Sequence, residues 1–297
     1  MEDYRSIDDL KRIAWRLSRS VIQMTTRAGS GHPSSSLSAI DVLTALYFGG
    51  VMRYDAGRPR WAGRDRFIMS KGHAAPALYA VLAEAGFFDP AVLGTLRQIG
   101  SPVEGHPNMR VLPGVEASTG SLGQGLSIGL GHALAARLDD LDFRVYVMIG
   151  DGESDEGQVW EAAMAASKYG AANLTAILDY NGFQQTGPVR TVMPSLEPVR
   201  DKWISFGWDV SEINGHDMEE TLAVFRALAR GGNMSGARPQ IVIAHTMKGR
   251  GLSPFEKDDV NRKHGVPLSP EEAEVALAEL DEAYGAGGGT GGRAGES

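Results

Sequence analysis

The chain has 297 residues, of which 42% are hydrophobic and 22% charged, a composition typical of a folded protein with a sizeable core. Its net charge of −8 argues against a general nucleic-acid binder or membrane-surface binder, since both need a basic face. The absence of cysteine excludes disulfides, thiolate metal sites and a cysteine nucleophile.

The first half of the chain is predicted to consist mainly of helices separated by glycine-rich breaks. Hydrophobic residues recur at helical spacing over 7–27, 37–48, 75–86 and 126–138. Ser6 precedes the first of these helices and can cap it. A short strand is expected over 65–70, and glycine-rich loops over 29–33 and 113–125.

The second half alternates between strands and helices. Strands are predicted over 144–149, 174–179, 208–213 and 240–245, and helices over 156–169, 197–206, 218–230 and 270–284. Short apolar strands separated by helices indicate a mostly parallel sheet with helices on both faces. We therefore expect a doubly wound α/β fold.

The chain is expected to form one domain followed by a tail. No linker interrupts residues 1–284, whereas residues 285–297 are rich in glycine and lack the apolar pattern of a folded segment, which is typical of disorder. The polar N-terminus does not resemble a signal peptide, and no apolar run is long enough to span a membrane. We expect a cytoplasmic protein without membrane contact.

Two successive strands of the second half end in residues suited to a metal ion. Strand 144–149 is followed by Gly150, Asp151 and Gly152, and strand 174–179 by Asn181 and Gly182. Ligands of doubly wound sheets bind beyond the carboxyl ends of the strands, and Mg²⁺ prefers oxygen ligands there. Asp-Gly or Asn-Gly alone is typical of a turn, but both at successive strand ends favour a metal–diphosphate site.

Histidine is concentrated beside glycine. Five of the seven histidines directly follow a glycine, and a sixth, His264, precedes one. A single Gly-His pair is typical of a loop with a solvated imidazole. Several such pairs indicate a site, because glycine permits close approach of the backbone and histidine can donate, accept and titrate near neutral pH.

These patterns resemble a known family. The Gly-Asp-Gly…Asn pattern is similar to the thiamine diphosphate signature, and its surroundings resemble the N-terminal domain of transketolase. The segments that carry this resemblance are 29–33 (GSGHP), 70–74 (SKGHA), 105–107 (GHP), 118–125 (STGSLGQG), 150–157 (GDGESDEG) and 264–265 (HG). They follow the family's order and cover roughly residues 29–265.

The resemblance implies a role for each matching position. Asp151, Asn181 and the main-chain oxygen of Phe183 would hold Mg²⁺, or Ca²⁺ or Mn²⁺ in its place. The residues implied to bind thiamine diphosphate are His73, Gly120, Ser121, Leu122, Gly150, Asp151, Gly152, Asn181, Met247 and His264. The implied catalytic residues are His32, His106 and His264, which would face the substrate, and Glu156, which would lie at a subunit interface.

Several polar residues have plainer explanations. His132 and His216 match no active-site position of the family, so we expect structural roles for both. His245 follows a strand and can simply be packed, and Glu156 can cap its helix instead of meeting a partner. Lys248 and Arg250 either lie in a solvated loop, which we favour, or meet an anionic ligand.

The resemblance covers only the first part of a transketolase. We therefore expect a separate, C-terminal-type transketolase subunit to supply the pyrimidine-binding domain, in an α₂β₂ complex. The implied reaction is transfer of a two-carbon ketol unit from a ketose to an aldehyde, with sugars or sugar phosphates as substrates. The alternatives are the α subunit of a 2-oxo acid dehydrogenase, a 1-deoxyxylulose-5-phosphate synthase-like enzyme, or a non-catalytic binding protein with this fold.

Overall fold

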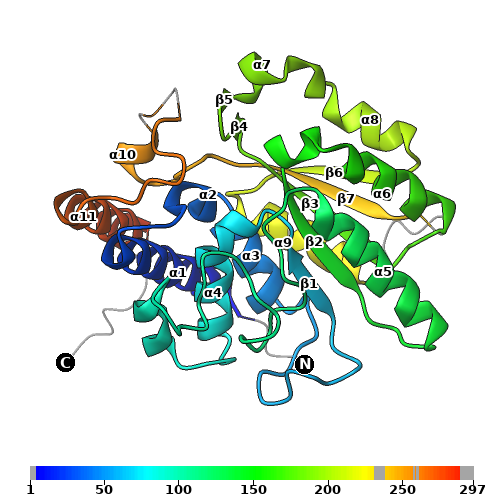
Figure 1. Cartoon of the computed structure of the whole chain (residues 1–297), viewed down its shortest axis with the longest axis horizontal. Coiled ribbons are helices and arrows are strands. Elements are labelled where there is room, and N and C mark those ends of the chain that lie inside the picture. Colours follow the sequence, from blue (N-terminus) through cyan, green and yellow to red (C-terminus); the bar gives the residue numbers. More distant parts are fainter. Residues whose placement is uncertain (1–4, 231–237, 257, 259–260, 288–297) are drawn as a thin grey trace, which may run out of the picture.

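A parallel sheet of five strands forms the centre of the computed structural model, which describes residues 5–230, 238–256, 258 and 261–287. The strands lie in the order β1 (Arg66–Met69), β2 (Val145–Gly150), β3 (Leu174–Tyr180), β7 (Gln240–His245) and β6 (Asp209–Asn214) (Figure 1). All four pairings are parallel. The predicted doubly wound α/β fold is confirmed.

Helices cover both faces of this sheet. One face carries α1 (Ile7–Ala28), α3 (Ile40–Phe48), α4 (Ala75–Glu84) and α9 (Met218–Ala229), with α2 (Pro33–Leu37) and α11 (Pro270–Gly287) beside them (Figure 1). The other face carries α5 (Gln124–Leu138), α6 (Gly157–Lys168) and α8 (Val199–Ser205). Two separate hydrophobic cores result, because successive side chains of a strand point to opposite faces.

Strand β2 shows this division residue by residue. Tyr146 and Met148 belong to the core under α1, α3, α4 and α9, whereas Val145, Val147 and Ile149 belong to the core under α5 and α6. All five side chains are fully buried. A strand buried on both faces carries a continuous apolar run, which is why the sequence predicted β2 well.

The order of strands in the sheet changes between β3 and β7. Strands β1, β2 and β3 follow one another in chain order, whereas β6 lies at the edge and the later strand β7 lies between β6 and β3. The connection from β2 to β3 passes over one face through α6, and the connection from β6 to β7 passes over the other face through α9. Strand ends diverge at such a point and leave a crevice beyond the carboxyl edge. The loops after β2, β3 and β7 meet there.

Three departures from the predicted elements concern loops and helix ends. The helix predicted over 37–48 begins only at Ile40, as α3, and the short helix α2 before it was not predicted. Between the two helices, the Ser38 hydroxyl contacts Asp179 and the Ser35 carbonyl. The hairpin of β4 (Phe183–Gln184) and β5 (Gly187–Pro188), with α7 (Val189–Val192), was not predicted. A short helix, α10 (Ser253–Glu256), follows β7.

The N-terminal and C-terminal helices lie side by side. Trp15 of α1 stacks on Tyr284 of α11 with 5.0 Å between ring centroids, and its indole N–H donates to Asp281 at 3.0 Å. Ser6 caps α1 as predicted, since its hydroxyl accepts from the Asp9 amide. Helix α11 runs to Gly287, three residues beyond its expected end, and the rest of the predicted tail lies outside the described residues.

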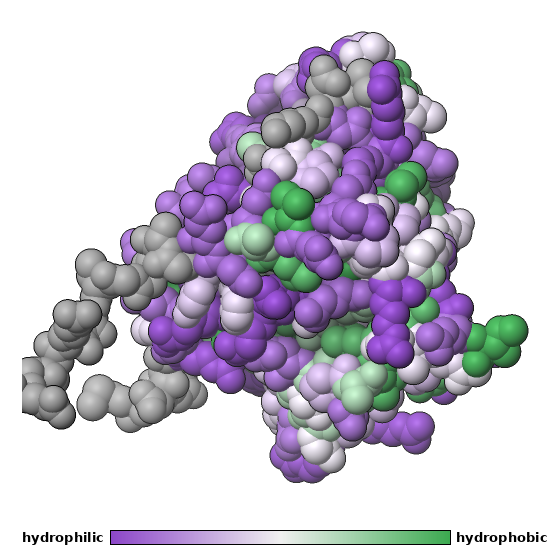
Figure 2. All heavy atoms as spheres, turned by 90° about the vertical axis from the view of Figure 1, so that its left-hand side faces the viewer, coloured by the Kyte–Doolittle hydropathy of each residue, from purple (hydrophilic) through white to green (hydrophobic). Residues whose placement is uncertain are grey.

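The outer surface on the side of α1 and α11 is mostly hydrophilic, with hydrophobic side chains in small separate patches (Figure 2). Among the described residues, no helix is both long and apolar enough to cross a membrane.

Candidate functional site

A cavity of about 550 Å³ lies at the carboxyl ends of β1, β2 and β3. The predicted site residues that line it are His32, His73, His106, Gly120, Leu122, Gly150, Asp151, Gly152, Glu156, Asn181, Phe183 and His264. They come from segments far apart in the sequence. The sheet register brings them together, because Gly150 of β2 pairs with Asp179 of β3 and the two strands end level.

Asp151 and Asn181 lie on neighbouring strand ends, as predicted. One Asp151 carboxylate oxygen accepts from the Gly152 amide at 2.8 Å, and the other accepts from the Gly182 amide at 2.6 Å. The Asn181 side-chain oxygen accepts from the Phe183 amide at 3.1 Å. Each side chain is therefore held in place by the turn that follows its strand.

The Asp151 carboxyl is almost fully buried, and this changes its acidity. Burial, with the nearby charge of Asp179 as a second cause, raises its pKa to about 7. Two backbone amides act in the opposite direction but do not overcome burial. A divalent cation beside the carboxyl would favour the charged form.

A buried salt bridge lies beneath this edge, between Lys71 and Asp179. The sequence analysis assigned no role to either residue. Both side chains are 1% exposed. Lys71 also donates to the Ser35 carbonyl at 2.9 Å, and Asp179 accepts from the hydroxyls of Ser38 at 2.6 Å and Thr246 at 2.5 Å. Lys71 belongs to segment 70–74 (SKGHA), and the resemblance of this segment to the family could have pointed to the residue.

Three of the predicted histidines form one cluster. The ring centroids of His32 lie 5.2 Å from those of His73 and His264, and the latter two lie 5.6 Å apart. Burial, followed by neighbouring positive groups, lowers the pKa of His32 to about 4 and of His264 to about 3. It also lowers the pKa of His73 and of His106. All four are neutral at pH 7.

Lys248 is buried, so its expected place in a solvated loop is wrong. Its ammonium donates to the Asn261 side-chain oxygen at 2.5 Å and to His264 Nδ1 at 2.7 Å. Burial lowers the pKa of Lys248 to about 8. Because an ammonium has no acceptor, His264 must accept at Nδ1 and carry its proton on Nε2. Arg250 is exposed, as expected.

Glu156 and Glu153 take different positions at the start of α6. Glu156 is the residue before the helix, is exposed, and makes no capping hydrogen bond with its side chain. Glu153 is buried and accepts from the amides of Gly123 at 2.9 Å and Gly150 at 3.0 Å. Glu153, which the sequence did not single out, therefore ties the glycine-rich loop to the end of β2.

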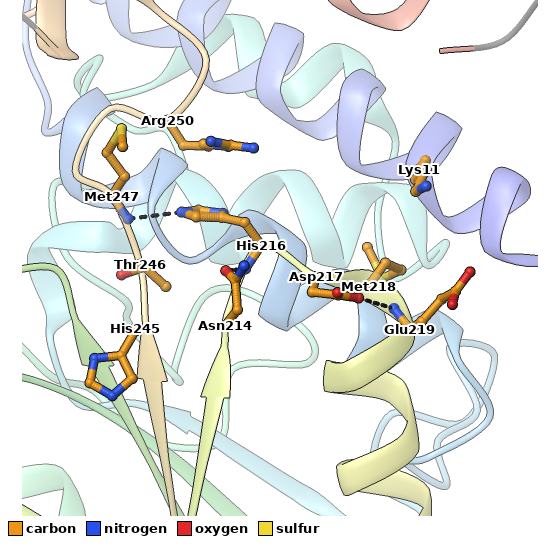
Figure 3. Close-up of a pocket in the computed structure, with 10 residues that line it drawn as sticks. All are labelled: Lys11, Asn214, His216, Asp217, Met218, Glu219, His245, Thr246, Met247 and Arg250. Atoms are coloured by element: carbon orange, nitrogen blue, oxygen red, sulfur yellow. Dashed lines mark hydrogen bonds between the residues drawn. The ribbon is translucent and has the colours of Figure 1, made fainter.

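Two predicted cofactor residues do not line this cavity. Ser121 is exposed beside Gly120 and Leu122. Met247 is 44% exposed and lines a second cavity of about 680 Å³ at the ends of β6 and β7 (Figure 3). Met247 also lines a small cavity of about 140 Å³ that Asn181 and Phe183 share. Its predicted role is not tested by this arrangement.

The second cavity also contains His216, for which a structural role was predicted. Its Nε2 accepts from the Met247 amide at 2.8 Å (Figure 3). Its Nδ1 lies 2.8 Å from an Asp41 carboxylate oxygen. The amide fixes the tautomer, so Nδ1 carries the proton and donates to Asp41. His245 lies at the same edge and bonds to Glu212 at 2.9 Å. His132 is half-buried on α5.

The first cavity fits a diphosphate held through a divalent cation. Two glycines let the segments around it pack closely, because a Cβ on Gly152 would lie 2.3 Å from Gln184 Cβ and one on Gly72 would lie 2.7 Å from the Gly120 nitrogen. His32 Nδ1 is buried and has no hydrogen-bond partner among the described residues. The structure describes no group of three or more His, Asp or Glu placed to hold a metal, so a cation here needs phosphate or water oxygens as well.

The chain is similar to known proteins over most of its length. Residues 12–286 match the family described as Transketolase, thiamine diphosphate binding domain. The chain is 44% identical to an apulose-4-phosphate transketolase subunit of Phocaeicola vulgatus, over 88% of this chain and 90% of that protein. It is 41% identical to 6-deoxy-6-sulfo-D-fructose transketolase subunit SqwG of a Clostridium species, over 92% and 96% respectively.

Longer transketolases match only in part. The chain is 42% identical to human transketolase over 94% of this chain but 43% of that protein. A crystal structure of a transketolase variant from Pichia stipitis superimposes with a TM-score of 0.83 at 29% identity, over 95% of this chain and 41% of that chain. The transketolase of Campylobacter jejuni gives 0.82 at 30% identity, over 94% and 42%.

Proposed function

The chain belongs to the family of transketolase thiamine diphosphate-binding domains, and from this premise we propose that it is the diphosphate-binding subunit of a two-chain transketolase. The observation that carries the proposal is the meeting of Asp151, Asn181 and four neutral histidines in one cavity at the carboxyl edge of the sheet. The two-chain organisation is supported by the two relatives named as subunits, which the chain matches over 90% and 96% of their length.

In this proposal the loops after β2 and β3 hold the cation and the diphosphate. Asp151, Asn181 and the main-chain oxygen of Phe183 bind Mg²⁺, or Ca²⁺ or Mn²⁺ in its place, and phosphate and water oxygens complete its shell. His73, His264 and the Gly152 amide contact the diphosphate. Gly120, Leu122 and Gly150 line the cofactor cleft, and Ser121 and Met247, which lie outside the first cavity, are proposed to contact the cofactor from beside it.

Thiamine diphosphate, when bound, supplies the carbon nucleophile and electron sink that cleavage of a ketose C–C bond needs. His32, His106 and His264 serve the substrate oxygens. A neutral imidazole offers one donor and one acceptor, so it can give a proton to one oxygen and accept from another. Lys248 fixes which nitrogen of His264 is the donor, namely Nε2.

The partner is proposed to be a C-terminal-type transketolase subunit with the pyrimidine-binding domain. Glu156 is exposed and makes no capping contact, which leaves its carboxylate available to a subunit interface. Closed symmetry then favours an α₂β₂ complex. We propose sugars or sugar phosphates as substrates, with a cytoplasmic location.

Co-expression with a pyrimidine-domain chain from the same genome tests this function. The purified complex should transfer a ketol unit from a ketose to an aldehyde when thiamine diphosphate and Mg²⁺ are present, and this chain alone should not. The relatives are named for a phosphorylated and a sulfonated sugar, so the donor screen should contain both kinds of ketose. Turnover by the isolated chain would contradict the two-chain proposal, and a complex that binds no cofactor would contradict the function itself.

A further inference from the structure

A single buried carboxylate connects the loops around the site. Asp179 belongs to β3, and its partners are Lys71 after β1, Ser38 after α2 and Thr246 after β7. Each of these partners lies close in sequence to a residue that lines one of the cavities at this edge. The carboxylate therefore contacts four segments of the chain, two of which are also joined by the hydrogen bond from Lys71 to the Ser35 carbonyl.

Asp179 also contacts the side chain of Asn181, two residues later. The Asn181 amide nitrogen donates to Asp179 Oδ2 at 3.3 Å and lies 3.5 Å from the Ser38 hydroxyl. The opposite end of the amide, Oδ1, accepts one hydrogen bond, from the Phe183 amide at 3.1 Å. A carbonyl oxygen has two lone pairs, so one remains for a further ligand.

The shape of an asparagine side chain does not decide which end of its amide faces a cavity, because oxygen and nitrogen have nearly the same size. Two neighbours decide it here: the Phe183 amide can only donate and so requires the oxygen, and the Asp179 carboxylate can only accept and so requires the NH₂. With NH₂ bound to Asp179, the oxygen is the end left for a cation. The reversed amide would put two N–H groups at the cation and an oxygen against a carboxylate.

We propose that Asp179 is a positioning residue that fixes the Asn181 amide with its oxygen towards the metal, while the Lys71 ammonium holds Asp179 in place. This inference rests on the proposed function and assigns a role to a residue that does not itself contact the cation. Partners of this kind, one shell away from a metal, set its affinity by about 10- to 100-fold. The alternative is that Asp179 only neutralises Lys71.

The test is Asp179→Asn in the assembled complex, with Mg²⁺ titrated at saturating thiamine diphosphate and followed by calorimetry. An asparagine at this position keeps the shape but replaces the carboxylate by a neutral amide, so the hydrogen bond from the Asn181 NH₂ weakens and Asn181 is held mainly by the Phe183 amide. We expect Mg²⁺ affinity to fall by about 10- to 100-fold. A wild-type complex that shows no Mg²⁺-dependent binding would contradict the proposed function, whereas equal affinity of wild type and variant would contradict only this inference.

Asp65→Asn is the matched control. Asp65 is also a buried carboxylate, 2% exposed, and accepts from the amides of Arg53 and Arg144, both at 2.8 Å. It precedes β1 and so lies at the opposite, amino edge of the sheet. Its loss should lower the melting temperature and leave Mg²⁺ affinity unchanged. An equal loss of affinity in both variants would show that Asp179 acts only through general stability.

If Asp179→Asn does not fold, the wild-type complex provides the second test. NMR can follow exchange of the two Asn181 side-chain amide protons with solvent. Protection before and after Mg²⁺ addition supports the proposed orientation, because the NH₂ stays on Asp179 while the oxygen takes the cation. Exchange as fast as that of an exposed amide would overturn it.

Discussion

Two cavities lie at the carboxyl edge of the sheet. Both are lined by histidines, but the hydrogen bonds of the histidine rings differ between them. The cavity at β1, β2 and β3 contains four histidines, and the cavity at β6 and β7 contains His216 and His245. In the second cavity His216 uses both ring nitrogens in protein hydrogen bonds, and His245 is bonded to Glu212. In the first, His32 Nδ1 is buried without a described partner.

This difference separates His32, which we propose to act on the substrate, from His216. A Gly-His pair occurs in both cavities, so the pair alone does not distinguish them. What distinguishes them is whether the protein already satisfies the ring. A buried ring nitrogen without a hydrogen-bond partner lowers the stability of the fold. It is expected where a bound ligand can supply the missing partner. A change in the first cavity can therefore be compared with a matched change in the second cavity, which serves as its control.

The largest effect is expected from Asp151→Ala in the first cavity. The change removes the carboxylate proposed to anchor the cation, so calorimetry on the assembled complex should detect no Mg²⁺-dependent binding of thiamine diphosphate. Asp217→Ala in the second cavity is the control, because Asp217 caps α9 by accepting from the amides of Glu219 and Glu220. It should cost about 1 kcal/mol of stability and leave binding unchanged. Full binding by the Asp151 variant would place the metal elsewhere.

The next largest effect is on turnover. His32→Asn removes an imidazole proposed to exchange protons with substrate oxygens, so kcat of ketol transfer should fall by about 10²- to 10⁴-fold. His245→Asn removes a half-exposed imidazole from the second cavity and should leave kcat unchanged. Steady-state kinetics on both complexes makes the comparison. Similar losses in the two variants would erase the distinction between the cavities.

A smaller effect, on stability alone, is expected from His216→Asn. The change removes the acceptor of the Met247 amide and the donor to Asp41, and both partners lose a hydrogen bond. The free energy of unfolding should fall by about 1–3 kcal/mol, as measured by denaturant titration. Turnover per folded complex should stay at the wild-type level. A loss of turnover with unchanged stability would mean that the second cavity takes part in the reaction.

The sequence predicted the strands better than the contacts between loops. The strand expected over 240–245 is β7 itself, because a buried parallel strand carries its apolar run wherever the chain places it. The meeting of Asp151 and Asn181 followed from the same logic, since successive strands of such a sheet end at one edge. In both cases the apolar runs along the sequence were enough to predict the structure.

The Lys71–Asp179 pair and the Lys248–His264 bond could not be predicted in this way. The partners are separated by 108 and 16 residues, and their contact depends on loops whose paths no periodicity describes. The prediction for Lys248 was wrong for a related reason. A lysine among glycines is typical of a solvated loop, and the sequence did not show that Asn261 and His264 approach Lys248.

The smallest expected effect is the dependence of stability on pH near neutrality. The pKa of His32 is lowered from 6.5 to about 4, chiefly by burial, so below pH 6.5 the unfolded chain binds a proton that the folded chain does not. Stability from this group is complete above pH 6.5 and is lost as the pH falls towards 4. Denaturant titrations at pH 7, 6 and 5 should show a weaker pH dependence for His32→Asn than for wild type. By NMR, the His32 ring should remain neutral at pH 5, and a titration midpoint near 6.5 would show that the ring is not held in the first cavity as the structure has it.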